Sequence, residues 1–134
     1  MRSAAELAKQ FGAYIQTHLS ENREEIEKVH HLYMTARDYT DVYDKCGLLT
    51  PKTMLGHCLH LNTREIDAIA AAQANVAHCP TANLFLGSGL LKLDELLRHA
   101  ARVRGFLHYN RDGKPRIGLS LRINDTHSQG SAVE

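Results

Sequence analysis

Short apolar runs alternate with longer segments of helical period along the first hundred residues. The short runs predict strands at residues 13–18, 53–58 and 75–78. The segments between and around them carry apolar residues three and four positions apart, which predicts helices at residues 3–11, 22–34, 62–74 and 93–100. Strands separated by helices pair in parallel through right-handed crossovers, so the pattern predicts an α/β fold.

Several residues mark where these elements start and stop. Gly12 is expected to end the first helix, and Ser20 or Asn22 to cap the second. Asn62 followed three residues later by Glu65 has the form of a capping box, with Asn in place of Ser or Thr. These signals support the predicted order of strands and helices.

The pattern is less regular in three other segments. Residues 38–47 are expected to form a short helix or a loop, and residues 80–89, with two glycines and three bulky apolar side chains, a loop that shapes a pocket. Val103 is expected to begin a fourth strand, but no clear period follows it. We therefore divide the chain into residues 1–103 and a divergent tail, 104–134, that we expect to be poorly ordered.

Composition narrows the classes of partner. Of the 134 residues, 43% are apolar and 23% charged, as in ordinary soluble proteins, and the net charge of +1 gives no basic footprint for nucleic acid or an anionic membrane. We expect no signal peptide, and the sequence contains no apolar run of about twenty residues. The three cysteines form no Cys-x-x-Cys pair, so we expect free thiols in a reducing cytoplasm.

A histidine stands at the end of each of the three predicted strands: His18, His57 and His78. The carboxyl ends of parallel strands are where barrels and open sheets place their active sites. Glu21 follows His18 by three residues, and a histidine that holds a metal beside a carboxylate that moves protons can activate water. In a purely structural interpretation, His18 faces the core or caps a helix, and Glu21 is a first-turn acid favoured by the helix dipole.

Longer motifs contain these residues. They are Gln-Thr-His-Leu-Ser-Glu-Asn at 16–22, Tyr-Thr-Asp-Val-Tyr at 39–43, Leu-Leu-Thr-Pro-Lys-Thr at 48–53, His-Cys-x-His-Leu at 57–61 and Ala-His-Cys-Pro-Thr-Ala-Asn-Leu-Phe-Leu-Gly-Ser-Gly at 77–89. In this order they resemble the guanine deaminase family of the zinc-dependent amidohydrolase superfamily. The resemblance covers about residues 3–103, and Ala82 stands where that family usually has Ser.

The resemblance implies part of a (β/α)8 TIM barrel of the metallo-dependent hydrolase type, namely its fifth to seventh strands with their helices. It also implies a reaction of purine catabolism in which guanine and water give xanthine and ammonia, with the water activated by one zinc ion. The substrate would be a small molecule, with no nucleic-acid or membrane partner. The complete enzyme would be a homodimer in the cytoplasm.

The same resemblance implies roles for four side chains. His18 would be a zinc ligand that also borders the substrate, and Glu21 would bind the substrate and shuttle protons between the zinc-bound water and the purine ring. His57 would be catalytic by orienting or polarising that water. Asn83, in the pocket loop, would bind substrate or instead tie the loop together by hydrogen bonds. His60 and His78 are assigned no metal role.

Other parts of the family's site have no counterpart here. A His-x-His pair and a purine-gripping Arg would lie upstream of Met1, and a Gly-Thr-Asp run is replaced after Val103 by Arg-Gly-Phe-Leu-His, with Asp112 the nearest acid. One ligand does not hold zinc, because affinity comes from several ligands fixed together. We therefore expect an incomplete barrel segment that is not a competent enzyme alone.

Two alternatives stay open at this stage. The chain could belong to another aminohydrolase of the same superfamily, one that acts on a different purine, a pyrimidine or a triazine. It could also be a non-catalytic α/β fragment, such as one half of a split barrel.

Overall fold

The computed structural model describes residues 1–99, 102–109 and 115–122, and its centre is a five-stranded sheet. The strands are β1 (Ile15–Leu19), β2 (Thr53–His57), β3 (Asn75–Ala77), β4 (Arg102–Tyr109) and β5 (Pro115–Arg122). Their order across the sheet is β1-β2-β3-β5-β4, and β1, β2 and β3 are parallel. The predicted α/β fold with parallel strands joined through helices is confirmed.

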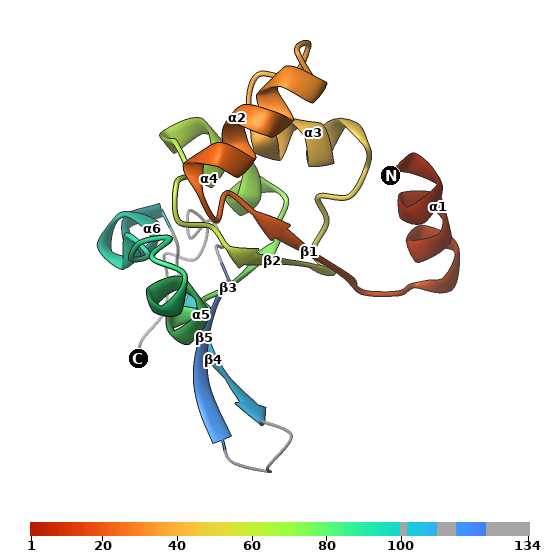
Figure 1. Ribbon diagram of the computed structural model, residues 1–134. Helices are drawn as coiled ribbons and strands as arrows, with labels where there is room; N and C mark the ends of the chain where they lie inside the picture. The colour runs from red at the N-terminus through yellow and green to blue at the C-terminus, as the bar shows by residue number, and fades with distance from the viewer. Residues whose placement is uncertain (100–101, 110–114, 123–134) are drawn as a thin grey trace, which may run out of the picture.

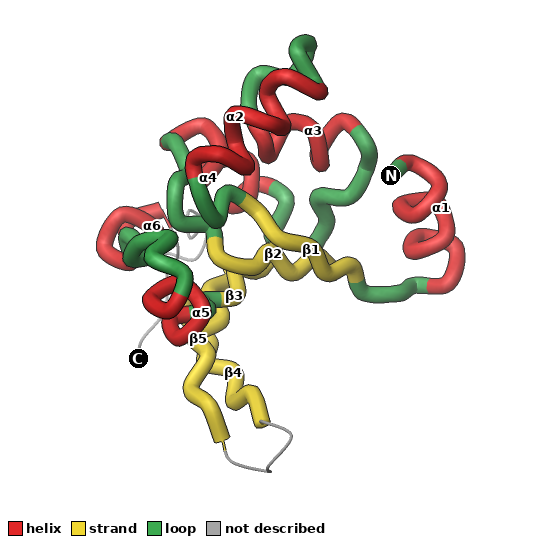
Figure 2. Tube along the Cα trace, viewed as in Figure 1, coloured by secondary structure: helices red, strands yellow, loops and turns green. Residues whose placement is uncertain are grey.

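Helices precede, connect and follow the parallel strands (Figures 1 and 2). They are α1 (Arg2–Phe11), α2 (Arg23–Leu32), α3 (Tyr39–Lys45), α4 (Thr63–Ala71), α5 (Pro80–Phe85) and α6 (Leu93–His99). The expected caps form: Gly12 ends α1 at a φ of 61°, and the Asn22 side chain accepts the backbone N–H of Glu25. Within the described residues, every helix is too short or too polar to cross a membrane.

Residues 80–85 differ from the expected loop, because they form α5. Pro80 occupies the first turn, where its fixed φ suits a helix and its missing N–H costs nothing. The backbone N–H of Asn83 then bonds the carbonyl of Cys79 at 3.0 Å. The three apolar side chains that follow are largely exposed, Phe85 at 88%, and their role in shaping a pocket stays a prediction.

Beyond α6 the chain forms an antiparallel hairpin. Strand β4 begins at Arg102, close to the predicted start at Val103, but it pairs with β5 and not with β3. Strand β5 runs antiparallel to β3, so the parallel order stops after three strands. Asp112 and residues 126–134 lie outside the described residues, and the division of the chain at residue 103 stays a prediction.

The core lies between the parallel strands and the helices α4 and α6. Leu19, Leu55 and Val76, one from each parallel strand, have no exposed surface, and they cluster with Ile66 and Ile69 of α4. Leu96 of α6 joins the same cluster. Full burial of such a side chain contributes about 1.5–3 kcal/mol, so these few residues account for much of the segment's stability.

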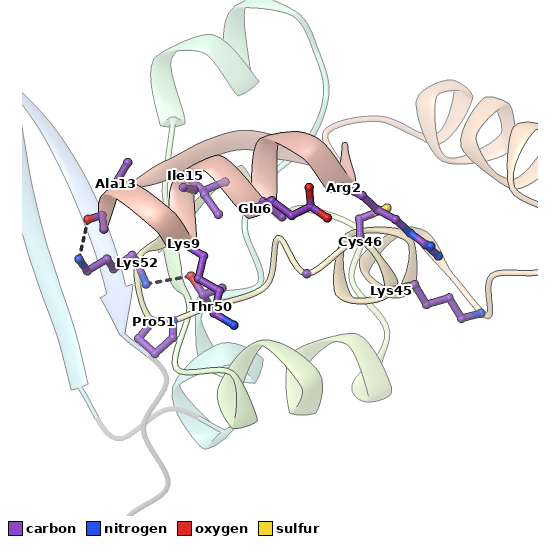
Figure 3. A pocket seen from close by; sticks show the side chains of 14 residues that line it. Arg2, Glu6, Lys9, Ala13, Ile15, Lys45, Cys46, Thr50, Pro51 and Lys52 are labelled. Carbon is purple, nitrogen blue, oxygen red and sulfur yellow. Dashed lines mark hydrogen bonds between the residues drawn. The ribbon is translucent and has the colours of Figure 1, made fainter.

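A cavity of about 610 Å³ separates α1 from the segment that leads into β2 (Figure 3). Small residues from both segments form much of its lining, and its charged side chains include Arg2, Lys9 and Lys52. Lys52 crosses between them, because its Nζ donates to the carbonyl of Gly12 at 2.6 Å. Apart from Ala5, no residue of α1 is buried, so this helix is held by few contacts.

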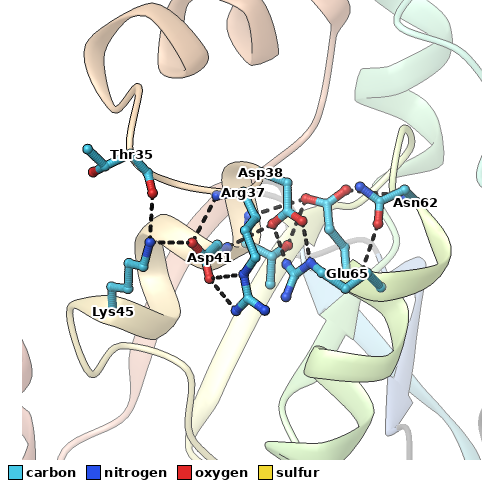
Figure 4. Close-up of polar contacts among 9 residues, drawn as sticks. Thr35, Arg37, Asp38, Asp41, Lys45, Asn62 and Glu65 are labelled. Carbon is cyan, nitrogen blue, oxygen red and sulfur yellow. Dashed lines mark hydrogen bonds and ion pairs between the residues drawn. The ribbon is translucent and has the colours of Figure 1, made fainter.

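A charged cluster joins α3 to α4 (Figure 4). Glu65, 3% exposed, completes the capping box with Asn62 and also accepts the Thr40 backbone N–H at 3.2 Å and its hydroxyl at 3.0 Å. Asp41 is fully buried and pairs with Arg37 and Lys45. Hydrogen bonds from Arg37, and then from Lys45, hold the pKa of the Asp41 carboxyl well below its usual range, against the opposing effect of burial.

We expect Glu65→Ala to lower the free energy of unfolding by about 2–4 kcal/mol, because a cap is worth about 1 kcal/mol and buried donors left unpaired cost about 1–3 kcal/mol more. Asn62→Ala, which removes only the cap, should cost about 1 kcal/mol. Urea unfolding measures both. The exposed Glu24→Ala is the control, and equal losses in all three variants would contradict the account.

We expect Asp41→Asn to lower the urea midpoint at neutral pH and to matter less in acid. Because the folded-state pKa of Asp41 is depressed, the unfolded chain takes up the proton first as the pH falls. The stabilisation is therefore complete above the ordinary carboxyl pKa of about 4 and is lost below it. Unfolding midpoints measured across this range test the trend, with the exposed Asp44→Asn on the same helix as control; a difference independent of pH would contradict it.

Candidate functional site

Two of the predicted histidines meet where β1 and β2 end. The parallel register sets His18 beside Gly56 and Leu19 beside His57. The rings of His18 and His57 lie 5.2 Å apart between centroids, tilted by 42°. A Cβ at Gly56 would stand 3.3 Å from Cδ2 of His18, so glycine at this position leaves room for the His18 ring to lie against β2.

The backbone turns sharply directly after both strands. Ser20, His57 and Cys58 have φ values of 51°, 70° and 54°, in the left-handed region that residues other than glycine rarely adopt. Backbone hydrogen bonds hold these turns. The N–H of Cys58 donates to the carbonyl of Leu19 at 2.8 Å, and the N–H of Leu59 donates to the carbonyl of Ser20 at 3.1 Å. Strain of this kind persists only where surrounding contacts impose it, and it is typical of functional sites.

Glu21, His57 and Asn83 converge at these turns. Nδ1 of His57 lies 2.7 Å from Oδ1 of Asn83 and 3.6 Å from Oε1 of Glu21. Asn83 is fully buried and His57 is 6% exposed, while 18% of the Glu21 side chain is exposed. A partly open carboxylate beside a buried imidazole is an arrangement that can exchange protons with a bound small molecule.

Ser88 is a member of this group that the sequence analysis did not identify. Its hydroxyl donates to Oε1 of Glu21 at 3.5 Å, and its carbonyl accepts from Nε2 of His60 at 3.1 Å. Gly87 and Gly89 on either side have φ values of 68° and 122°, which glycine adopts readily in a turn. The Gly-Ser-Gly sequence marked that turn, but nothing in it indicated the contact with Glu21.

The third strand-end histidine has a different environment. Nδ1 of His78 is buried and has no hydrogen-bond partner among the residues that the structure describes, and burial lowers the pKa of its imidazole, which keeps the ring neutral at pH 7. Cys58, beside the site, is 2% exposed, and burial raises the pKa of its thiol. A neutral, protonated thiol is a poor nucleophile, which favours a packing role for Cys58.

Zinc does not fit the described residues as a complete site. In residues 1–99, 102–109 and 115–122, no three His, Cys, Asp or Glu side chains converge as a metal would require. His18 has the chemistry of one ligand and is exposed, yet it belongs to no group of three such side chains among those residues. None of the site residues lines the cavity beside α1.

Known proteins provide close relatives for most of the chain. It is 47% identical over 103 residues to "Guanine deaminase" of Mus musculus, a match that covers 77% of the chain. It is 43% identical over 122 residues to "Probable guanine deaminase" of Schizosaccharomyces pombe, which covers 91% of the chain and so reaches past residue 103. Each match covers 23% of the relative, so the chain spans about a quarter of the length of these proteins.

Solved structures agree with the fold. Guanine deaminase from C. acetobutylicum, determined with guanine in its active site, has a TM-score of 0.70 and 36% identity, and the match covers 72% of this chain and 23% of that one. An adenosine deaminase from Xanthomonas campestris with bound zinc has a TM-score of 0.67 and 27% identity, covering 72% and 22%. The structural likeness confirms the predicted partial TIM barrel.

A family model described as the amidohydrolase family matches residues 1–107, which include every candidate site residue. The same residues carry the motifs, the parallel strands and the turns that bring Glu21, His57 and Asn83 together. The chain belongs to the amidohydrolase family.

Proposed function

We propose that this chain is a segment of a guanine deaminase-like aminohydrolase, which converts guanine and water to xanthine and ammonia. The observation that carries the proposal is the convergence of Glu21, His57 and Asn83 at the ends of parallel strands. It occurs in a chain that is 47% identical over 103 residues to a guanine deaminase. The guanine in the active site of the C. acetobutylicum relative supports a purine substrate.

Each side chain has a distinct part in this proposal. Glu21, partly exposed, takes a proton from the attacking water and delivers it to a ring nitrogen. It then moves the proton of the added hydroxyl to the amino group, so that the carbon–nitrogen bond breaks and ammonia leaves. His57, almost fully buried, hydrogen-bonds the attacking water and orients it. Asn83 is fully buried, so of the two roles expected for it we propose that it ties the loop together by hydrogen bonds and does not touch substrate.

His18 is proposed as one ligand of a zinc ion and as a neighbour of the substrate. The bound zinc of the X. campestris relative supports a zinc cofactor for proteins of this kind. Because the described residues do not complete a ligand set, we propose that this chain holds zinc only together with further ligands. We also propose that the complete enzyme is a homodimer and that it is cytoplasmic. The three free cysteines are consistent with the reducing cytoplasm.

A non-catalytic role is the second candidate. It is favoured by the missing ligand cluster in the described residues, which leaves the acid–base group without its metal partner. Another aminohydrolase activity has less support, because identity to the adenosine deaminase structure is 27% against 36% for the guanine deaminase structure. Two experiments separate these candidates.

The purified chain is expected to hold much less than one zinc per molecule and to release no ammonia from guanine. A single histidine ligand gives too little affinity to retain the metal. Elemental analysis and an ammonia assay on the same sample measure both quantities. Stoichiometric zinc with guanine-dependent ammonia would show that the chain builds a complete site and would refute the incomplete-site proposal.

Replacing the matching segment of a complete guanine deaminase by residues 1–103 is expected to give an active chimaera. In that chimaera, Glu21→Gln should reduce kcat by about 10²–10⁴-fold, the usual contribution of a general acid–base group. Glu24→Gln, at an exposed acid in the first turn of α2, is the matched control and should leave kcat unchanged. A folded but inactive chimaera would support the non-catalytic candidate.

A further inference from the structure

The buried contact between His57 and Asn83 carries an inference about protons that goes beyond the assignment of site residues. Nδ1 of His57 and Oδ1 of Asn83 are 2.7 Å apart, a distance typical of a well-formed hydrogen bond. An amide oxygen is only an acceptor, so the hydrogen in this bond must be on Nδ1. A neutral imidazole with its hydrogen on Nδ1 keeps a lone pair on Nε2.

The neighbouring carboxylate supports this orientation of the amide. Oε1 of Glu21 is 3.6 Å from the same Nδ1. If the Asn83 amide were reversed, its Nδ2 would donate to a lone pair on Nδ1, and that lone pair would face the Glu21 carboxylate. Two electron-rich groups facing each other in a nearly dry site repel, whereas an N–H between two acceptors is attracted to both.

Asn83 is itself held firmly at both backbone groups. Its N–H donates to the carbonyl of Cys79 at 3.0 Å, and its carbonyl accepts from the N–H of Ser88 at 2.9 Å. The same Ser88 contacts Glu21 through its hydroxyl. One buried asparagine therefore bonds His57 through its side chain. Through its backbone carbonyl it also holds Ser88, whose hydroxyl contacts Glu21.

We infer that Asn83 is a positioning residue that fixes His57 in the Nδ1–H tautomer, so that Nε2 is the hydrogen-bond acceptor offered to the attacking water. Glu21, at the longer distance, contributes to the tautomer but does not set it. This inference rests on the proposed role of His57 in the site.

Nitrogen NMR of the full 134-residue chain tests the inference without substrate, metal or activity. Long-range proton–nitrogen spectra distinguish Nδ1–H rings, Nε2–H rings and rings that carry both hydrogens. We expect Nδ1–H at His57 in the wild-type chain, retained in Asn83→Asp, where a carboxylate oxygen replaces the amide oxygen. In Asn83→Ala we expect a mixture of tautomers or Nε2–H.

Two further variants identify which acceptor is responsible. Glu21→Gln should retain the Nδ1–H tautomer, and so should Asn75→Ala, which removes an asparagine that bonds Pro51 and Thr53 away from the site. An Nε2–H ring at His57 in the wild-type chain would overturn the inference whatever the variants do. Loss of Nδ1–H in Glu21→Gln with its survival in Asn83→Ala would assign the role to Glu21 and would also overturn it.

The inference and the proposed function fail separately. An inactive chimaera with Nδ1–H at His57 in this chain would refute the function and leave the tautomer assignment intact. An active chimaera with an Nε2–H ring at His57 would refute only the positioning role of Asn83.

Discussion

The parallel register of β1 and β2 is the constraint on which the rest of this structure depends. Setting Leu19 beside His57 fixes which residues enter the core and which stand at the carboxyl edge of the sheet. A shift of one residue would exchange the two faces, because side chains alternate along a strand. The buried leucines of both strands therefore stabilise the register and, with it, the approach of Glu21 to His57.

Polar side chains of α2 and α3 hold the end of β1. The Tyr43 hydroxyl donates to the carbonyl of His18 at 2.8 Å and lies 3.0 Å from the hydroxyl of Thr17. The N–H of Glu21 donates to Glu25 at 2.9 Å, and Tyr39 donates to the same carboxylate. Helices α2 and α3 thus hold the end of β1 by hydrogen bonds, although α2 buries no residue completely.

Local signals made the parallel strands and most helices predictable from the sequence. These signals act within a few residues: the spacing of apolar positions, the helix end at Gly12, the cap at Asn22 and the capping box of Asn62 and Glu65. The structure contains all of them. The short helix α5 and the antiparallel hairpin were not predicted, since a Pro-initiated turn and a strand pairing depend on neighbours that sequence patterns do not reveal. The contact between Asn83 and His57 joins residues 26 positions apart, so the sequence did not reveal it, although the motifs alone singled out both residues.

That separation also bears on how the site assembles. The contact between His57 and Asn83 joins the end of β2 to α5, which directly follows the β-α-β unit made of β2, α4 and β3, and it involves no residue of β1. Loop-closure entropy grows only slowly with length, and contacts within one such unit form faster than pairings between distant segments. In kinetic terms, we expect the hydrogen bond between the asparagine and the histidine to need only this crossover and the turn that follows it, whereas the contact with Glu21 also needs β1 in place.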